Sequence, residues 1–402
     1  MTLAEELAWR GFVNQTTFAD ITDVNTPRTL YFGVDPSAES MQIGNLAAMM
    51  MVRHFMEHGH KVILMAGGAT GMIGDPDGKK QERDLRDEAV VERNVEGLKK
   101  QFSIIFAGKS FEVVNNNDWF KNINYIDFLH KVGKHVSMTQ LLDRDFVQQR
   151  IGKGGSGISY GEFSYSLIQG YDFLHLFREK GVTLQLAGAD QWGNSITGAS
   201  LVRKLAGGEA HVYTTPLVIN KQTGVKFGKS EGGAVWLDAA KTSPYKFYQF
   251  WLNVDDETAE DLIKIYTLLD KDTVLALIER HRQNPAAREL QKTLAREVTT
   301  LIHGEDRARA VQRASQLLFS KEEFELDAPT LEVLRHELPV QPIGTSAVEA
   351  LVAAEIAKSN GEARRLVASN AVSVNGQKLV EDVKIEAPSL IKKGKNNFVV
   401  VA

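Results

Sequence analysis

The fold expected for this chain is decided by one stretch, Tyr31-Phe32-Gly33-Val34-Asp35-Pro36-Ser37-Ala38-Glu39-Ser40-Met41-Gln42-Ile43-Gly44-Asn45-Leu46. The preceding residues 29–32 predict a short strand that ends at Gly33, and 35–37 have turn chemistry. From Leu46 to Gly59, apolar residues recur at helical spacing. A strand, a glycine-bearing turn and a helix form the first half of a mononucleotide-binding unit, whose helix N-terminus attracts an anion.

Further strands and helices alternate along the first half of the chain. We expect strands over 61–65 and 182–186, and helices over 79–105, 115–150 and 163–177. This alternation predicts an α/β domain with a parallel sheet over residues 1–225, carrying a helical insertion at about 115–150. The glycine-rich stretch 66–76 follows a strand, so its backbone either approaches a ligand closely or only forms a tight turn.

The pattern changes in the second half. Residues 242–320 show helical periodicity, and we expect the segment 226–320 to form a loop followed by an α-helical domain. Residues 321–342 are acidic and carry prolines, which predicts a linker. The remaining residues 343–402 begin with two short helices and continue with alternating stretches, which predicts a small third domain.

Composition narrows the classes of protein that fit. The 402 residues carry a net charge of −4, so any contact with nucleic acid is expected to be local. Cysteine is absent, which excludes disulfides and thiolate metal sites. No apolar run has the length of a membrane span, and the acidic, amphipathic residues 1–10 are unlike a secretory signal. We therefore expect a cytoplasmic protein that does not enter a membrane.

Two motifs match known signatures in letters only. Residues 152–157 spell the dinucleotide fingerprint G-x-G-x-x-G, but they follow a helical pattern over 146–151 instead of a strand, which favours a plain loop. His54-Phe55-Met56-Glu57-His58 has the H-x-x-E-H spacing of a zinc protease class. The same residues also fit the last turn of a helix, where histidine interacts favourably with the helix dipole.

A second loop carries positively charged side chains, which the turn after the first strand lacks. In Lys226-Phe227-Gly228-Lys229-Ser230, two lysines lie three residues apart around a glycine, with Gly232 and Gly233 just after. Such a loop can close over a polyphosphate and supply positive charge where negative charge develops. The alternative is an ordinary pair of solvated lysines.

Taken together, these motifs resemble those of class I aminoacyl-tRNA synthetases, specifically the bacterial-type tyrosyl enzymes. Residues 42–45 occupy the position of the family's HIGH signature, and 226–230 that of its KMSKS signature. The resemblance covers essentially the whole chain, through the further motifs Tyr31-x-Gly33-x-Asp35-Pro36, 67–76, 162–165, 169–173, 190–194 and 242–251. It implies a Rossmann-like catalytic domain, a helical anticodon-recognition domain over 226–320 and a C-terminal RNA-binding domain similar to S4.

The resemblance implies a tyrosine–tRNA ligase that joins L-tyrosine to ATP, releases pyrophosphate and passes the tyrosyl group to the 3′ end of tRNA(Tyr). Tyr31 and Asp172 match the partners of the substrate phenol. The remaining matches to tyrosine-binding residues are those near the ammonium (Asp75, Tyr165 and Gln169), Gln191 near the carboxylate, and Gln185. Each of these residues could instead be an ordinary buried, hydrogen-bonded polar group.

The same resemblance implies an ATP site. It is formed by Gly33, Asp35, Ser37, Gly44, Asp190 and Lys229. The groups that clamp the pyrophosphate are expected to be Lys79, Arg83, Lys226, Lys229 and Ser230, and Mg²⁺ is expected to accompany ATP.

One departure from the family concerns catalysis. Gln42 and Asn45 replace the two histidines that in the family donate hydrogen bonds to the reacting phosphate. Side-chain amides also donate, although without a full charge. We expect a working enzyme with amide donors. The alternatives are an inactive paralogue that acts as an RNA-binding protein, and a tryptophan-specific synthetase; Asp172 with Tyr31 argues against the latter.

Two kinds of partner follow from the resemblance. In the C-terminal region, Arg364, Arg365, Lys378, Lys392, Lys393 and Lys395 are candidates to follow an RNA backbone, or form a solvated basic face. The insertion at about 115–150 matches the segment through which family members pair. Its apolar residues, among them Trp119, Phe120, Ile126, Phe128, Leu129 and Val132, suit a packed interface, so we expect a homodimer.

Overall fold

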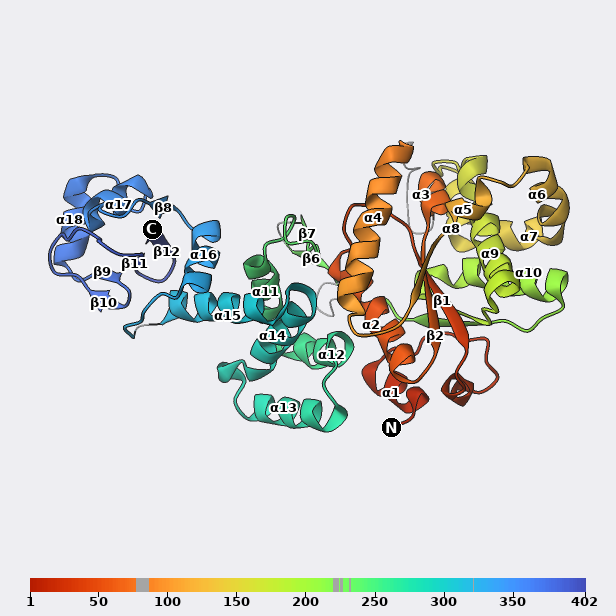
Figure 1. Cartoon of the computed structure of the whole chain (residues 1–402), viewed down its shortest axis with the longest axis horizontal. Coiled ribbons are helices and arrows are strands. Elements are labelled where there is room, and N and C mark those ends of the chain that lie inside the picture. Colours follow the sequence, from red (N-terminus) through yellow and green to blue (C-terminus); the bar gives the residue numbers. More distant parts are fainter. Residues whose placement is uncertain (77–86, 220–223, 225–226, 231–232, 321) are drawn as a thin grey trace. The chain divides into compact units, whose positions relative to one another are not determined.

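The computed structural model describes residues 1–76, 87–219, 224, 227–230, 233–320 and 322–402. The chain forms two compact units. The first contains residues 1–238 and 255–290, and the second contains 239–254 and 291–402. The helices at 256–283, expected in a separate helical domain, therefore belong to the first unit. Figure 1 shows the elements in order along the chain.

The first unit is built on a parallel sheet of five strands. Their spatial order is β3-β2-β1-β4-β5, and every neighbouring pair is parallel. The strands are β1 (Thr29–Val34), β2 (Lys61–Ala66), β3 (Glu112–Asn115), β4 (Leu184–Gly188) and β5 (His211–Thr215). The order reverses between β1 and β4, and the crevice outside the carboxyl ends at such a point is where open α/β sheets bind ligands.

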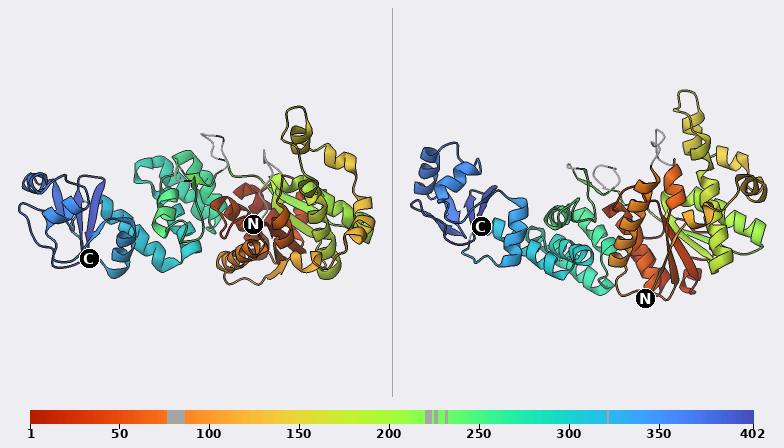
Figure 2. Two further views of the ribbon diagram at one scale, coloured as in Figure 1. Left: turned by 90° about the horizontal axis from the view of Figure 1, so that it is seen from above. Right: turned by 45° about the horizontal axis from the view of Figure 1, so that its top comes forward.

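Helices cover both faces of this sheet. Helices α9 and α10 flank one face as a closely packed pair, and α2 and α4 flank the other (Figures 1 and 2). The helical elements of this unit outside the insertion are α1 (Leu3–Arg10), η1 (Ile21–Asn25), α2 (Ile43–Glu57), α3 (Gly68–Ile73), α4 (Glu88–Ile105), α9 (Tyr160–Lys180), η3 (Ala189–Gln191), α10 (Trp192–Ala206), α12 (Asp256–Tyr266), α13 (Lys271–Gln283) and η4 (Pro285–Ala287).

The central strand and the helix after it differ slightly from the expectation. Gly33 does not end β1, because it pairs in register with Met65 of β2 and the strand continues to Val34. Helix α2 starts at Ile43 instead of Leu46, so Gln42 is its N-cap and Asn45 lies in its first turn. The signature residues are therefore part of the helix N-terminus itself.

The insertion forms short helices beside α9 and α10 (Figure 2). They are α5 (Asn117–Phe120), α6 (Tyr125–Lys131), η2 (Gly133–His135), α7 (Met138–Leu142) and α8 (Asp145–Ile151). Val132 is buried within the chain, whereas Ile126 is 67% exposed. Residues 152–157 follow α8, a helix, so the strand that the dinucleotide fingerprint requires is not there.

A charged cluster ties the N-terminal helix to the rest of this unit. The Arg10 guanidinium is buried and donates to three backbone carbonyls at the end of α12. They belong to Lys264 in the last turn of the helix and to Thr267 and Leu269 just after it. Glu6 accepts from Arg10 at 3.0 Å and lies 3.3 Å from His54 Nδ1. His54 thus contacts a carboxylate, and among the described residues no group of three metal-binding side chains is found.

The second unit combines helices with a mixed sheet. Its helices are α11 (Pro244–Leu252), α14 (Glu289–His303, which begins in the first unit), α15 (Glu305–Phe319), α16 (Ala328–Glu337), α17 (Ala347–Ala353) and α18 (Asn360–Ala368). Its sheet has the order β10-β9-β11-β12-β8. The strands are β8 (Val340–Gln341), β9 (Val372–Val374), β10 (Gln377–Lys378), β11 (Ser389–Lys393) and β12 (Asn397–Val401).

The stretch 321–342, expected to be a linker, contains helix α16 and strand β8. Pro329 lies in the first turn of α16 after the capping residue Asp327, a position where proline favours a helix. Pro329 thus begins a helix and does not mark a linker. Throughout the described ranges, no helix combines the length and apolar character needed to cross a membrane.

Candidate active site

Three turns meet at the carboxyl edge of the sheet. They follow β1, β2 and β4, and side-chain hydrogen bonds join them. Asp35, just after β1, accepts from Thr70 Oγ1 of α3 at 2.7 Å and from Tyr165 Oη of α9 at 2.8 Å. Asp75 accepts from Gln191 Nε2 of η3 at 2.5 Å. Residues far apart in the sequence are thus assembled at one place.

The glycines after β2 serve this assembly. A Cβ atom on Gly67 would collide with Asp35, and one on Gly71 would lie 2.8 Å from Pro36. The absence of side chains therefore lets α3 lie directly against the turn after β1. The sequence left open whether the backbone of residues 66–76 approaches a ligand or only forms a tight turn. The observed contacts of Gly67 and Gly71 are with Asp35 and Pro36, so these glycines allow two segments of the protein to pack closely.

Asp172 of α9 lies in the interior and is fully buried. Its carboxylate accepts from Trp119 Nε1 at 2.9 Å and from Asn116 Nδ2 at 3.1 Å. Burial raises the pKa of Asp172 well above its usual range, while these two hydrogen bonds lower it. Asn116 also donates to Thr70 Oγ1 at 3.1 Å, so a continuous hydrogen-bonded chain connects Asp172 to Asp35 through Thr70.

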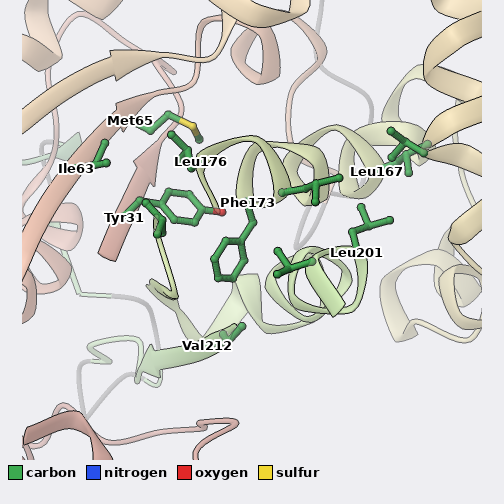
Figure 3. Packing of buried hydrophobic residues seen from close by; sticks show 12 residues of the cluster. Tyr31, Ile63, Met65, Leu167, Phe173, Leu176, Leu201 and Val212 are labelled. Carbon is green, nitrogen blue, oxygen red and sulfur yellow. The ribbon is translucent and has the colours of Figure 1, made fainter. Parts of the chain in front are cut away.

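Tyr31 faces the same interior from the central strand. Its side chain points from β1 towards α9, where Phe173 packs against it with ring centroids 5.3 Å apart (Figure 3). Its hydroxyl is buried and has no hydrogen-bond partner within the described part of the chain. Burial raises the pKa of Tyr31 well above its ordinary value, and the charge of nearby Asp172 raises it further.

Two glutamines add to the unpaired polar atoms here. Gln185 of β4 is directly paired with Tyr31 of β1 in the register of the sheet, so both side chains leave the same face. The Oε1 atoms of Gln185 and of Gln169 on α9 are buried and have no partner among the described residues. Leaving a buried polar group unpaired costs about 1–3 kcal/mol, so three of them together indicate a binding site for a polar ligand.

The second part of the site lies at the start of α2. A pocket with about 330 Å³ of empty space, part of it open to solvent, is lined by residues that include Asp35, Ser37, Gln42, Asn45 and Trp236. Asn45 Oδ1 accepts the backbone N–H of Gln42 at 3.0 Å. Because its oxygen is used in this way, the amide nitrogen of Asn45 is left as the donor. Gly33 is exposed at this edge of the sheet.

The lysine-bearing loop reaches this helix start. A Cβ atom on Gly44 would lie 3.3 Å from the carbonyl oxygen of Phe227, and Gly228 is in similar contact with Gly44. Val235 joins the two segments, since its N–H donates to Gly228 and its carbonyl accepts from Ile43. Lys229 and Ser230 form β6, which pairs with β7 (Gly233–Ala234). Lys79, Arg83 and Lys226 lie outside the described residues.

Asp190 is exposed beside Gln191 in η3, at the end of β4. The predicted tyrosine-binding and ATP-binding residues with described side chains lie in β1 and β4, in the turns after the strands, in the first turn of α2, or in the first half and middle of α9. Asn116 and Trp119 are functional candidates that sequence reasoning missed. The sequence suggests only a packing role for Trp119, because nothing in a single sequence distinguishes an indole that packs from one that donates a hydrogen bond to a carboxylate.

One candidate for RNA contact has another role. Lys392 Nζ donates to the carbonyls of Leu318 and Ser320 at the end of α15. Carbonyls at the end of a helix lack partners within it, so the lysine caps α15, a role that the sequence does not predict for Lys392. Arg364 and Arg365 of α18 remain exposed.

Comparisons with known proteins agree with this geometry. The family model of tRNA synthetases class I (W and Y) matches residues 23–320, and that of the tyrosine–tRNA ligase SYY-like C-terminal domain matches 327–401. The tyrosine–tRNA ligases of Flavobacterium psychrophilum and Bacteroides fragilis are each 42% identical to the chain. The alignment with the first covers 99% of both chains, and that with the second covers 100% of this chain and 99% of the relative.

Solved structures give the same result. The C-terminally truncated mitochondrial tyrosyl-tRNA synthetase of Aspergillus nidulans superposes with a TM-score of 0.71 at 28% identity, covering 79% of this chain and 94% of that one. The chain therefore belongs to the class I tRNA synthetases of the tryptophan and tyrosine group. Within that group its full-length relatives are bacterial tyrosine–tRNA ligases, which confirms the resemblance inferred from the motifs.

Proposed function

We propose that this chain is a tyrosine–tRNA ligase, which activates L-tyrosine with ATP to tyrosyl-adenylate and then transfers the tyrosyl group to tRNA(Tyr). The relatives that match it over its full length carry that name, and the family to which it belongs consists of ligases of this class. The proposal also assigns a role to each part of the site described above.

The observation that carries the proposal is the buried pair of Tyr31 and Asp172. A phenol carries one hydroxyl that both donates and accepts a hydrogen bond. The carboxylate of Asp172 has room for a further donor beyond Asn116 and Trp119, and the unpaired hydroxyl of Tyr31 supplies a second partner. An amino acid without the hydroxyl leaves both groups buried and unsatisfied, which disfavours its binding.

The other end of tyrosine meets the sheet edge. Asp75, Tyr165 and Gln169 are proposed to hold the ammonium, and Gln191 the carboxylate. Tyr165 is buried and already donates to Asp35, so it is held in place before substrate arrives. Buried Gln185 and partly buried Gln169 each offer an oxygen with no partner in the described chain, and such an oxygen can accept a hydrogen bond from the substrate.

ATP is proposed to occupy the pocket beside α2. Gly33 and Gly44 belong to the strand end and helix start beside it, Asp35, Ser37 and Asp190 provide polar partners, and Gln42 and Asn45 donate to the reacting phosphate. Lys79, Arg83, Lys226, Lys229 and Ser230 are proposed to bind the leaving pyrophosphate. Mg²⁺ would be held mainly by the phosphates with few protein ligands, which is its usual behaviour with nucleotides.

Amino-acid-dependent exchange of pyrophosphate with ATP tests this function. We expect exchange with tyrosine, and none above background with tryptophan or phenylalanine. Exchange with tryptophan alone would make the chain a tryptophan-specific enzyme. Absence of exchange with every amino acid, in protein whose circular dichroism shows a folded chain, would leave only an RNA-binding role.

The insertion is proposed to form a homodimer interface. Large apolar side chains are exposed along it and at the start of α9, namely Tyr125, Ile126, Met138, Ile151 and Tyr160. Exposed apolar side chains in such numbers suit an interaction site, and a second copy of the chain offers the same residues. Sedimentation should give a dimer that Ile126→Asp converts to monomer. Val380→Asp, at an equally exposed valine of the second unit, should remain dimeric; monomeric wild-type protein would contradict the proposal.

The C-terminal region is proposed to contact tRNA through Arg364 and Arg365 of α18. Removing two phosphate contacts lowers affinity and flattens its dependence on salt. The variant with both arginines changed to Ala should bind tRNA(Tyr) more weakly, with a reduced salt slope, and should keep its tyrosine-dependent exchange. Unchanged affinity and slope would exclude these arginines from the tRNA interface.

A further inference from the structure

Arg144 connects the insertion to the candidate tyrosine site. It is the N-cap residue of α8, and its guanidinium reaches α9 and α10. Nη1 donates to Asn194 Oδ1 at 2.6 Å and to Ser166 Oγ, while Nη2 donates to the Gly193 carbonyl at 2.7 Å and to Thr197 Oγ1 at 2.8 Å. Three of these four acceptors belong to the beginning of α10, and Ser166 belongs to α9.

From Asn194 a chain of amides leads to the sheet edge. Asn194 Nδ2 donates to Gln191 Oε1 at 3.1 Å, and Gln191 Nε2 donates to Asp75 Oδ2 at 2.5 Å. Ser166 Oγ also donates to Asn194 Oδ1 at 2.5 Å. Asn194 and Ser166 are buried, so water does not offer them alternative partners.

The direction of this chain has a chemical cause. An amide can be turned over with little change in shape, so Asn194 and Gln191 could in principle present either oxygen or nitrogen to a neighbour. A guanidinium carries only donors. The carboxylate of Asp75 carries only acceptors, so it requires the nitrogen of Gln191 and leaves the Gln191 oxygen facing Asn194. Arg144 requires the oxygen of Asn194, so the nitrogen of Asn194 is turned to this Gln191 oxygen.

We propose that Arg144 is a positioning residue for tyrosine activation: by binding the oxygen of Asn194 it turns the Asn194 N–H to the oxygen of Gln191, and this holds Gln191 with its N–H groups towards Asp75 and the substrate carboxylate. This inference rests on the proposed function, in which Asp75 and Gln191 bind the two charged groups of tyrosine. Two amide side chains, those of Asn194 and Gln191, lie between Arg144 and Asp75, and the arginine acts through them.

Two variants test the direction of the chain. Arg144→Met keeps the length of the side chain and removes its donors. Asn194→Asp keeps an acceptor for Arg144 but has no N–H for Gln191, so the oxygen of Gln191 loses its donor and faces a carboxylate, and Gln191 is no longer held in place. In tyrosine-dependent exchange, we expect each variant to raise the KM for tyrosine about 10- to 100-fold, the scale of losing one or two hydrogen bonds to charged groups.

The control is Thr197→Val, which removes another acceptor of the same guanidinium outside the amide chain. It should change the KM for tyrosine less than threefold, and the KM for ATP should change little in all three variants. Because Arg144 and Asn194 act in one chain, their effects should not add. The double variant should raise the KM for tyrosine no more than the more impaired of the two single variants does. A general loss of folding would instead lower the yield and melting temperature without this selectivity for tyrosine.

Three outcomes would overturn the inference. One is an equal rise in the KM for tyrosine in Thr197→Val, which would make Arg144 a packing residue. Another is additive effects in the double variant. The third is normal exchange in Arg144→Met with impaired transfer to tRNA, which would assign the arginine to the tRNA step. Wild-type exchange with tyrosine is measured alongside, so failure of the proposed function is detected separately.

Discussion

The two ends of the candidate site use different physical means to bind a ligand. At the tyrosine end, side chains of β1, β4 and α9 are buried, and their polar atoms are either locked together, as at Asp172, or left without partners, as at Tyr31. At the phosphate end, the pocket is open and is lined by the N-terminus of α2 and by turns.

The difference follows from what each end must recognise. A phenol differs from its competitors by one neutral hydroxyl, so selection needs buried groups whose desolvation is offset only by that hydroxyl. A triphosphate carries several charges, and backbone N–H groups at a helix N-terminus with nearby lysines attract it even when solvated. Substitutions at the two ends should therefore change different kinetic constants.

The largest effect is expected at the buried end. Asp172→Asn replaces an acceptor by an amide whose NH₂ group faces the donors Asn116 and Trp119 or the substrate hydroxyl. One donor must then lose its partner in a dry site. We expect kcat/KM for tyrosine in the exchange assay to fall by roughly 10²–10³, corresponding to about 3–4 kcal/mol.

The matched variant is Trp119→Phe, which removes one donor to Asp172 and leaves the carboxylate in place. It should lower kcat/KM for tyrosine by less than Asp172→Asn. Kinetics with phenylalanine sharpen the comparison, because Asp172→Asn should narrow the preference for tyrosine over phenylalanine. An unchanged preference would show that the hydroxyl is recognised elsewhere.

At the phosphate end, Lys229→Ala should act on the rate alone. If the lysine binds the phosphates as charge develops on them, its loss lowers the rate of tyrosyl-adenylate formation by on the order of 10²-fold. The equilibrium affinity for tyrosine, measured in the absence of ATP, should change less than twofold. Equal losses of rate and of tyrosine affinity would contradict the assignment of tyrosine binding to the buried end and of phosphate binding to the open end.

The sequence predicted the backbone of both ends for an understandable reason. Strand, glycine turn and helix are local patterns, and parallel strands bring their following turns to one edge, so the convergence of the Asp35, Asp75 and Asp190 turns could be expected. Side-chain partnerships between distant segments leave no such local signal. Asn116 at Asp172, Arg144 at Asn194 and Lys392 at the end of α15 are of this kind.

A third change addresses the substitution of the family histidines. Asn45→Ala removes an amide donor at the start of α2, and the rate of tyrosyl-adenylate formation should fall about 10-fold, near the lower end of the 1–3 kcal/mol scale for such groups. Asn45→Asp is the matched variant, because its carboxylate still accepts the Gln42 N–H and keeps the helix cap.

The two variants separate capping from catalysis. Asn45→Asp should melt at the wild-type temperature yet lose at least as much rate as Asn45→Ala, since a negative charge faces the phosphates. Stopped-flow measurement of adenylate formation gives the rate, and a thermal melt gives the stability. A fully active Asn45→Asp variant would exclude Asn45 as a phosphate donor.

The smallest effect on activity is expected at the cluster of α1, which touches neither end of the site and provides a reference for pure stability. The hydrogen bond from His54, together with Arg10, lowers the pKa of Glu6 from 4.5 to about 2. A carboxylate with a lowered pKa in the folded state stabilises the fold above its unfolded pKa, and this contribution is lost as pH falls from about 4.5 towards 2. Burial also lowers the pKa of His54, so its protonation acts in the same direction.

Glu6→Gln should therefore lower stability near pH 6 by up to about 3 kcal/mol, the free energy equivalent of this pKa shift, and by much less at pH 3. Urea denaturation at the two pH values measures both quantities, with Glu92→Gln, at an exposed position of α4, as the control. Tyrosine-dependent exchange by the folded variant should equal that of the wild type. If the variant is destabilised equally at both pH values, the charge of Glu6 is not what holds α1 to the rest of the first unit.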